Sequence, residues 1–427
     1  MEHNRILKAT KELAILASPI ALGQISHMLI GVGDVFIAAR HGTVTVAAIG
    51  IANSIGHLIF LIGLGLLLGI SPTLARKRGQ AEQIKDYFYT CVVYSLLIGV
   101  VFSSLTMLST YIVPLLGFEK HLVPVINDYL FLVSFSYIGA YIFSAVKEYL
   151  QASEKVIIPN TISLIAVPLN VILNYLFVFG VGFIPEFGAR GLAYATIITR
   201  TLMGVSVFIY ALRFDKVTFS IVKNYARHVF KFSIPISMSI FIEVLAFSAV
   251  MILIGRIGHV YAAVHSIALT LSSTTFMIPL SVSSAVSVKI SYFNARHKKE
   301  RVLDFIKASL FVSMSFMAIA GIFMYSLPKT ILSFFTPDPS IIYIGIPIIF
   351  VCALFQILDG AQVTLSGILR GLGITKPTFF IVATGYWMVG IPLGYYLGIY
   401  KSMNVLGFWI GIAVALSLIA LMLFIYL

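Results

Sequence analysis

The stretch SIFIEVLAFSAV (Ser239–Val250) places one carboxylic acid, Glu243, in a run that is otherwise almost entirely apolar. It lies within an apolar segment, 232–255, and a helix needs roughly 20 mostly apolar residues to cross a bilayer. The other segments of this kind are separated by short charged or Gly/Pro-containing breaks and are 13–38, 45–74, 87–113, 122–146, 157–181, 191–212, 260–288, 305–327, 340–368, 378–399 and 404–426. Together they predict twelve transmembrane helices.

The composition of the whole chain agrees with this prediction. Hydrophobic residues make up 59% of the 427 residues and charged residues only 11%, with a mean hydropathy of +1.02, far above that of a soluble chain. Only helices or closed barrels satisfy their backbone in lipid, and barrel strands show alternation rather than long continuous apolar runs. The expected fold class is therefore an all-α integral membrane protein.

The formal net charge of +13 follows the expected topology. If the spans alternate in direction, one side of the membrane carries most basic side chains: Arg5, Lys8, Lys11, Arg76, Lys77, Arg78, Lys85, Lys147, Lys155, Arg213, Lys216, Lys223, Arg227, Lys231, Lys289, Arg296, Lys298, Lys299, Arg301, Lys307, Arg370 and Lys376. The other side carries Arg40, Lys120, Arg190, Arg256, Lys329 and Lys401. The positive-inside rule then predicts a multi-pass membrane protein with both termini in the cytoplasm. We expect no nucleic-acid partner.

Several function classes lack their sequence signatures. The chain has no GxxxxGK[ST] loop, HExxH motif or nucleophile elbow, so neither an ATP-driven pump nor an enzyme of these kinds is expected. Cys91 and Cys352 both fall in apolar spans and are expected to be packing residues. We expect no organic cofactor.

The two halves of the chain resemble each other at a displacement of about 216 residues. The segment SPIALGQISHML from Ser18 resembles IPISMSIFIEVL from Ile234, and their alignment pairs Pro19 with Pro235. Because each half contains an even number of spans, both copies enter the membrane in the same direction. The sequence predicts two six-helix bundles, 1–212 and 232–427, that face each other across a cavity and are joined by a basic cytoplasmic linker, 213–231.

Three carboxylic acids, Asp34, Glu243 and Asp359, fall far from any predicted helix end. A carboxylate at the bilayer centre costs roughly 2.5–3.5 kcal/mol on insertion scales, so it needs a reason to be there. The one basic residue well inside a predicted span is Arg200, which suffices to neutralise one acid but not three. A water-filled cavity or an ion pathway is the better interpretation.

Polar residues three or four positions apart extend these acids into stripes along their helices. The stripes are Gln24, His27, Gly31 and Asp34; Gln356, Asp359, Gln362 and Ser366; Ser239 and Glu243; and Asn170 and Asn174. For the Asn and Gln side chains, hydrogen bonding between helices is as good an interpretation as a cavity lining. For His27, His57 and His265, proton relay and hydrogen-bonded packing both remain open.

A carboxylate inside the membrane has two uses in transport. It coordinates Na⁺ together with other oxygens, or it takes up H⁺ when desolvation raises its proton affinity. Either loaded state competes with an organic cation for the same negative field. The residues leave the choice between Na⁺ and H⁺ open.

Several segments resemble the multidrug and toxic compound extrusion (MATE) transporters of the NorM type. They are AAVHSIALTLSSTTFMIPLSVSSAVSV (Ala262–Val288), GDVFIAARHG around Asp34, PLNVILNYLFVFG around Asn170 and LDGAQVTLSGILRGLG around Asp359. The resemblance covers nearly the whole chain. It implies a V-shaped antiporter that exports small, often aromatic organic cations in exchange for Na⁺ or H⁺, and we expect it to act as a monomer.

The resemblance also implies roles for individual residues. Coupling-cation binding falls to Glu243, Asp359 and Asp34, with Na⁺ at Glu243 and Asp359 as one form. The polar site of the N-terminal bundle comprises Asn170, Asn174 and Thr196, and the cavity residues are Phe355, Gln362, His27 and Gln24. Phe355 departs from the family, where a Tyr tends to stand one turn before the acid, so a phenol oxygen is lost and proton coupling stays open.

Two other functions remain alternatives to antiport. A lipid-linked oligosaccharide flippase of the same superfamily needs a cavity for a large anionic headgroup, whereas the acids here predict a negatively charged one. A passive channel predicts equally fast uptake and efflux without an ion gradient.

Overall fold

The computed structural model describes residues 2–182, 184–215 and 217–427, and Lys216 of the predicted basic set lies outside them. Its regular structure is helical throughout these residues. Eleven helices are long and apolar enough to cross a membrane, and a bent pair brings the number to twelve. The predicted all-helical membrane fold is confirmed.

The first half of the chain forms α1 (Glu2–His41), α2 (Thr43–Leu67), α3 (Ile70–Gly79), η1 (Ile84–Tyr87), α4 (Phe88–Ser109), η2 (Val113–Leu116), α5 (Leu122–Ser134), α6 (Ser136–Ala152), α7 (Ile157–Phe179) and α8 (Ala189–Asp215). The second half forms α9 (Lys223–Ile257), α10 (His259–Ala295), α11 (Lys299–Ser326), α12 (Pro328–Phe335), α13 (Pro339–Leu372), α14 (Lys376–Ala383), η3 (Thr384–Gly390), α15 (Ile391–Tyr395), η4 (Tyr396–Tyr400) and α16 (Asn404–Tyr426).

Each predicted span coincides with one helix or a series of short helices, but three details differ from the expectation. The fourth span is bent by 41° between α5 and α6. The eleventh is a series of short helices, α14 to η4, with π-helical turns. The break within 213–231 is shorter than expected, because α9 already begins at Lys223 and buries Tyr225 and Val229 one turn apart.

Large apolar side chains in the middle of several helices point out of the protein. Leu97, Ile165 and Ile319 are each more than 60% exposed. A soluble protein would bury such side chains, whereas lipid solvates them. Their exposure agrees with the transmembrane assignment.

The chain divides into two compact units, each described here by itself. Unit 1 comprises Met1–Ala21 and Met238–Leu427, and unit 2 comprises Leu22–Ser237. The chain passes from one unit to the other within α1 and again within α9.

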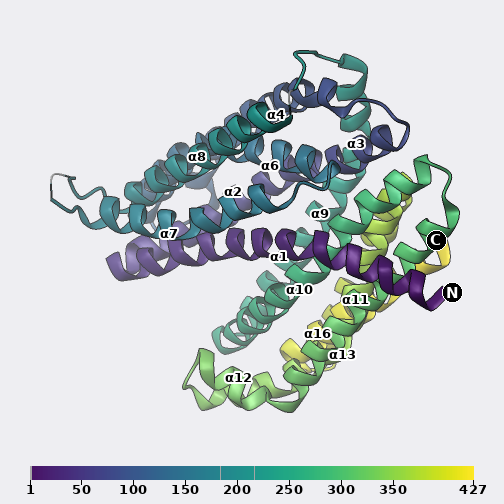
Figure 1. Cartoon of the computed structure of the whole chain (residues 1–427). Helices are drawn as coiled ribbons and strands as arrows, with labels where there is room; N and C mark the ends of the chain where they lie inside the picture. The colour runs from purple at the N-terminus through teal and green to yellow at the C-terminus, as the bar shows by residue number, and fades with distance from the viewer. Residues whose placement is uncertain (1, 183, 216) are drawn as a thin grey trace. The chain divides into compact units, whose positions relative to one another are not determined.

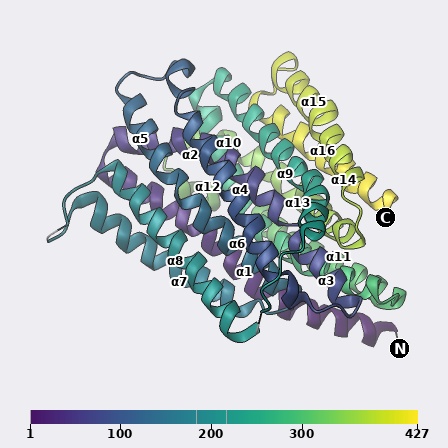
Figure 2. The same cartoon turned by 90° about the horizontal axis from the view of Figure 1, so that it is seen from above.

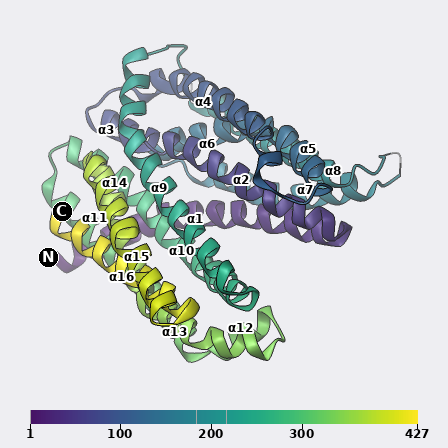
Figure 3. The ribbon, with the colours of Figure 1, turned by 180° about the vertical axis from the view of Figure 1, so that it is seen from behind.

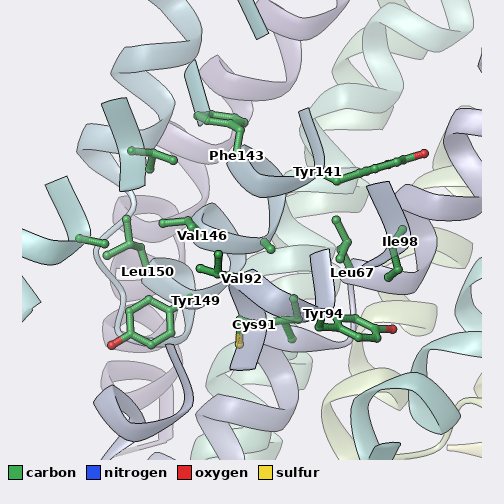
Figure 4. Close-up of a cluster of buried hydrophobic side chains, with 14 of the residues drawn as sticks. Leu67, Cys91, Val92, Tyr94, Ile98, Tyr141, Phe143, Val146, Tyr149 and Leu150 are labelled. Carbon is green, nitrogen blue, oxygen red and sulfur yellow. The ribbon is translucent and has the colours of Figure 1, made fainter. Parts of the chain in front are cut away.

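In unit 2, α6 is the central helix and packs against α2, α3, α4 and α8, while α7 lies beside α8 (Figure 1). Figure 4 shows part of its buried cluster, to which α2 contributes Leu67, α4 Val92 and α6 Val146. Since lipid is as apolar as these side chains, close packing rather than transfer from water holds such helices together.

Two glycines set the contact between α6 and α8. A Cβ on Gly204 would lie 2.7 Å from the carbonyl oxygen of Gly139, and one on Gly139 would lie 2.9 Å from the backbone of Thr201. Neither position has room for a side chain. Arg200 stands one turn before Gly204 on α8. The close approach of the two backbones therefore fixes the position of Arg200 along the axis of α6.

In unit 1, α13 is the central helix and packs against α10, α11 and α16 (Figure 3), with α14 and α15 beside α16 (Figure 2). Glycines again allow close contact, because a Cβ on Gly367 of α13 would lie 2.4 Å from the Ser283 carbonyl oxygen of α10. The first turns of α1 belong to this unit, and Glu12 accepts hydrogen bonds from Arg301 of α11 at 2.9 Å.

The two units use equivalent contacts. In unit 2, the Tyr137 hydroxyl of α6 donates to the Gly56 carbonyl of α2 at 2.8 Å. In unit 1, the Gln356 amide of α13 donates to the Thr275 hydroxyl of α10 at 2.8 Å. The second pair stands 219 positions after the first along the chain.

Candidate cation-binding sites

Unit 1 brings Glu243 of α9 and Asp359 of α13 within electrostatic range of each other. Tyr386 of η3 donates its hydroxyl to Glu243 Oε1 at 3.0 Å. Asp359 is 7% exposed and Glu243 is half-buried. Two carboxyl groups and a phenol therefore share one region in the middle of this unit.

Neither acid has a basic partner among the described residues. No Lys, Arg or His nitrogen of this part of the chain lies within ion-pair distance of Glu243 or Asp359. Burial of like charges close together is costly unless a cation or a proton compensates them. The pair thus has the chemistry of a cation-loading site.

Tyr386 is a site residue that the sequence reading missed. The sequence offered only its place in TGYWMVG, within a span broken by glycines, and an aromatic residue there is as readily a packing residue.

Phe355, which the resemblance places in the cavity, packs against another aromatic ring. It is 4% exposed and stacks on Trp409 of α16, with ring centroids 5.9 Å apart and an interplanar angle of 12°. A small apolar pocket does lie beside the site, lined in part by Phe247, Tyr386 and Ile412.

In unit 2, hydrogen bonds connect Asp34, Asn170 and Asn174 into one cluster. Asn174 of α7 donates its amide to Asp34 Oδ1 of α1 at 2.7 Å and to Asn170 Oδ1 at 3.0 Å. All three side chains are buried. Thr196 is also buried, but its hydroxyl donates to the Leu192 carbonyl of its own helix at 2.9 Å rather than to the cluster.

The backbone of α1 reaches α7 through a glycine next to the acid. A Cβ on Gly33 would lie 3.0 Å from Val171 Cγ2 of α7. Asn170 Nδ2 and Asn174 Oδ1 have no hydrogen-bond partner among the described residues. These two atoms, together with Asp34, give the cluster unused capacity to bind a cation or water.

Arg200 distinguishes the site of unit 2 from that of unit 1. Its guanidinium donates to Ser136 Oγ at 2.9 Å and lies 5.0 Å from the ring centroid of Phe60. It forms no ion pair within the described residues but lies within electrostatic range of Asp34. Asp34 therefore has an internal positive charge nearby, whereas the unit 1 pair has none.

The remaining predicted residues are spread over both units. In unit 2, Gln24 is half-buried. His27 is exposed, and its ring centroid lies 5.9 Å from that of Phe143. In unit 1, Gln362 is 3% exposed, and its Oε1 has no partner in the described part of the chain. No group of three or more His, Cys, Asp or Glu suited to a metal ion occurs among the described residues.

Solved structures with the same fold include proteins described as transporters. The eukaryotic MATE transporter AtDTX14 aligns with a TM-score of 0.90 at 20% identity, covering 99% of this chain and 96% of that one. An outward-facing multidrug resistance MATE family transporter of the MOP superfamily aligns with a TM-score of 0.89 at 18% identity, covering 98% and 95%. These likenesses establish the fold.

Sequence relatives extend over nearly the whole chain. "Probable multidrug resistance protein NorM" of Photorhabdus laumondii is 29% identical and covers 98% of this chain and 95% of its own length. The protein of the same name from Idiomarina loihiensis is 30% identical, covering 96% and 92%. The family model described as MatE matches residues 19–176 and 235–396, one segment in each half of the chain. With a full-length match to both the fold and the sequence pattern, the chain belongs to the MatE family of MATE transporters.

Proposed function

We propose that this protein is a secondary antiporter that exports organic cations in exchange for Na⁺ or H⁺. The observation that carries the proposal is the pair Glu243 and Asp359, two carboxyl groups within one membrane-embedded unit that have no basic partner in the described residues. Relatives named as probable multidrug resistance proteins support the export of drugs.

The physical argument begins with the energy of the unpaired acids. A charge within a bilayer is costly and is retained where it faces a cavity or carries an ion. Loading Na⁺ between the two carboxylates or adding H⁺ to one of them lowers this cost. The loaded and unloaded states therefore differ in energy, and a transporter needs such a difference to couple one movement to another.

Glu243 and Asp359 are proposed as the coupling-cation site, with Tyr386 as a third oxygen. The phenol donates to Glu243, and its oxygen lone pairs provide a further ligand for a hard cation such as Na⁺. Phe355 removes the phenol from α13 itself, and Tyr386 replaces that oxygen from η3.

Asp34 is proposed as a second cation site with Asn170 and Asn174. Arg200 opposes the binding of a further cation there, because like charges repel across the low-dielectric interior. We infer that this site therefore binds the coupling ion more weakly than the pair Glu243 and Asp359 does. Arg200 itself, lying over Phe60, shows how this region holds a planar cation against an aromatic face.

The two halves, 1–212 and 232–427, are proposed as pseudo-symmetric bundles joined by 213–231, with both termini in the cytoplasm of a bacterial cell. The basic residues gather on that side under the positive-inside rule. The equivalent hydrogen bonds of Tyr137 and Gln356, 219 positions apart, support the duplication.

The proposal is tested by dye efflux from proteoliposomes with a Na⁺ gradient or a pH gradient imposed separately. One gradient should drive efflux of a fluorescent cationic dye, and Glu243→Gln or Asp359→Asn should abolish it. Glu119→Gln, an acid in the break after η2, is the matched control and should transport normally. Equal dye movement with and without either gradient would indicate a passive channel instead.

A further inference from the structure

His265 of α10 is fully buried in unit 1, and neither of its ring nitrogens has a hydrogen-bond partner among the described residues. A neutral imidazole carries one hydrogen-bond donor and one acceptor, and it is costly to bury them without partners. The sequence left His265 open between a proton relay and hydrogen-bonded packing. Packing of that kind requires a protein partner, and the described residues supply none.

Trp409 of α16 repeats this feature beside His265. Its side chain is also fully buried, and its Nε1 has no partner among the described residues. The two ring centroids lie 5.5 Å apart. Two buried polar side chains in contact, both with unused hydrogen-bonding atoms, indicate a shared polar ligand rather than two separate defects.

Contacts lead from this pair toward the proposed cation site. Trp409 stacks on Phe355, with centroids 5.9 Å apart, and Phe355 stands one helical turn before Asp359 on α13. Next to Phe355, Gln356 donates its amide to Thr275, while its Oε1 is buried without a partner in the described part of the chain. Gln356 is thus a third buried polar side chain of unit 1 with an unused hydrogen-bonding atom.

Charged groups around this face are few. Of the helices that pack against α10, α16 carries no Asp, Glu, Lys, Arg or His, and all the charged residues of α11 lie in 299–307. On α13, the charged residues are Asp359 and Arg370. Asp359 is therefore the one acid on these helices beyond their charged ends.

We propose that His265, Trp409 and Gln356 bind buried water molecules within unit 1, and that these waters and the His265 ring relay protons to Asp359. Water is the ligand that buried polar groups take when no protein group reaches them. Because the side chains of His265 and Trp409 are fully buried, the track is suited to protons passed between neighbours rather than to a hydrated metal ion.

Each relay step conserves protons. A water on one side of His265 gives a proton to the unprotonated ring nitrogen and takes one from the next water outward. The other nitrogen gives its proton to the water on the Asp359 side, which passes one on to the Asp359 carboxylate. The imidazole returns to neutrality as the opposite tautomer, and one proton has moved. The relay rests on the proposed antiport function, whereas the water site does not.

Trp409 itself reports on the water. The chain has two tryptophans, so Trp387→Phe leaves Trp409 as the single emitter. We expect emission at longer wavelength than from a dry core and a higher intensity in D₂O than in H₂O. His265→Phe in this background should shift the emission to shorter wavelength and reduce the D₂O effect. His57→Phe, in unit 2, is the matched control and should leave both unchanged.

An emission that is the same in H₂O and D₂O and is unaffected by His265→Phe would overturn the water site. If His265→Phe fails to fold, His265→Gln provides the test, because its amide keeps a donor and an acceptor and should retain the D₂O effect. Loss of that effect in a folded His265→Gln protein would count against the proposal.

The relay is tested separately by pH-driven dye efflux in proteoliposomes. His265→Phe should slow efflux several-fold, while equilibrium binding of tetraphenylphosphonium is unchanged. Normal efflux from a variant whose water signal is lost would overturn the relay and leave antiport intact. If the wild-type protein shows no gradient-driven efflux, the proposed function fails, and the fluorescence still decides the water site.

Discussion

Gly204→Ala should destabilise unit 2 by closing the gap between α6 and α8. The added Cβ would lie 2.7 Å from the carbonyl oxygen of Gly139, whereas ordinary contacts of this kind need about 3.4 Å or more, so the helices must separate by about 0.7 Å. The obstructing atom belongs to the backbone and has no rotamer to escape into. Over-packing of this sort typically costs about 1–3 kcal/mol.

The matched control is Gly50→Ala on α2. A Cβ there meets nothing within 4 Å. Both substitutions replace a helical glycine and gain the same propensity of up to about 1 kcal/mol. That gain cancels in the comparison, so the two variants should differ in unfolding free energy by about 1–3 kcal/mol, with Gly204→Ala the less stable.

One buried cysteine in each unit provides the assay. Cys91 lies in unit 2 and Cys352 in unit 1, and both are buried. In a Cys352→Ala background, a thiol-reactive fluorophore reports the temperature at which unit 2 opens. Gly204→Ala should lower this temperature and Gly50→Ala should not. An equal or higher temperature for Gly204→Ala would refute the close α6–α8 contact and the placement of Arg200 that depends on it.

Two further outcomes follow from individual hydrogen bonds. Tyr386→Phe removes the bond to Glu243, and since a bond to a charged group contributes about 1.5–3 kcal/mol, the half-saturating concentration of the coupling cation in dye efflux should change by roughly tenfold or more. Tyr395→Phe, nearby but exposed, should leave it unchanged, and equal effects would contradict the site. Hydrogen bonding from Lys77 holds the pKa of Glu82 below its ordinary value, so its stabilisation is present above about pH 4.5 and is lost as pH falls through the lower folded-state pKa. Acidification should therefore lower the Cys91 labelling temperature slightly more in wild type than in Glu82→Gln. The underlying difference in unfolding free energy is less than about 1 kcal/mol, because the pair is largely exposed. An identical pH profile in the two proteins would contradict this.

The spans were predictable because the signal for a transmembrane helix is local. Length and continuous apolarity decide it, and neither depends on tertiary contacts. The bend between α5 and α6 was not predictable, because SYIGAYIF and its neighbours carry no proline at that point. The contact between Asn170 and Asn174 follows from the helical period, since residues four apart share a face.

The partners of the acids depend on which helices meet, and a single sequence does not contain that information. Tyr386 lies 143 positions from Glu243, and no local pattern links them. Phe355, which the resemblance places in the cavity, stacks on Trp409, and the sequence of α13 alone does not reveal that contact either. Arg200 was recognised as the one interior cation, but its contacts with Ser136 and Phe60 appear only in the structure.

The central claim is that Glu243 and Asp359 load the coupling cation, and counting that cation tests it directly. Purified protein in weak buffer is titrated with tetraphenylphosphonium, and the release of H⁺ or of pre-bound Na⁺ is measured per protein. The account predicts release from wild type and from Asp34→Asn, and none from Glu243→Gln or Asp359→Asn. Undiminished release from both unit 1 variants, or its loss in Asp34→Asn alone, would contradict it.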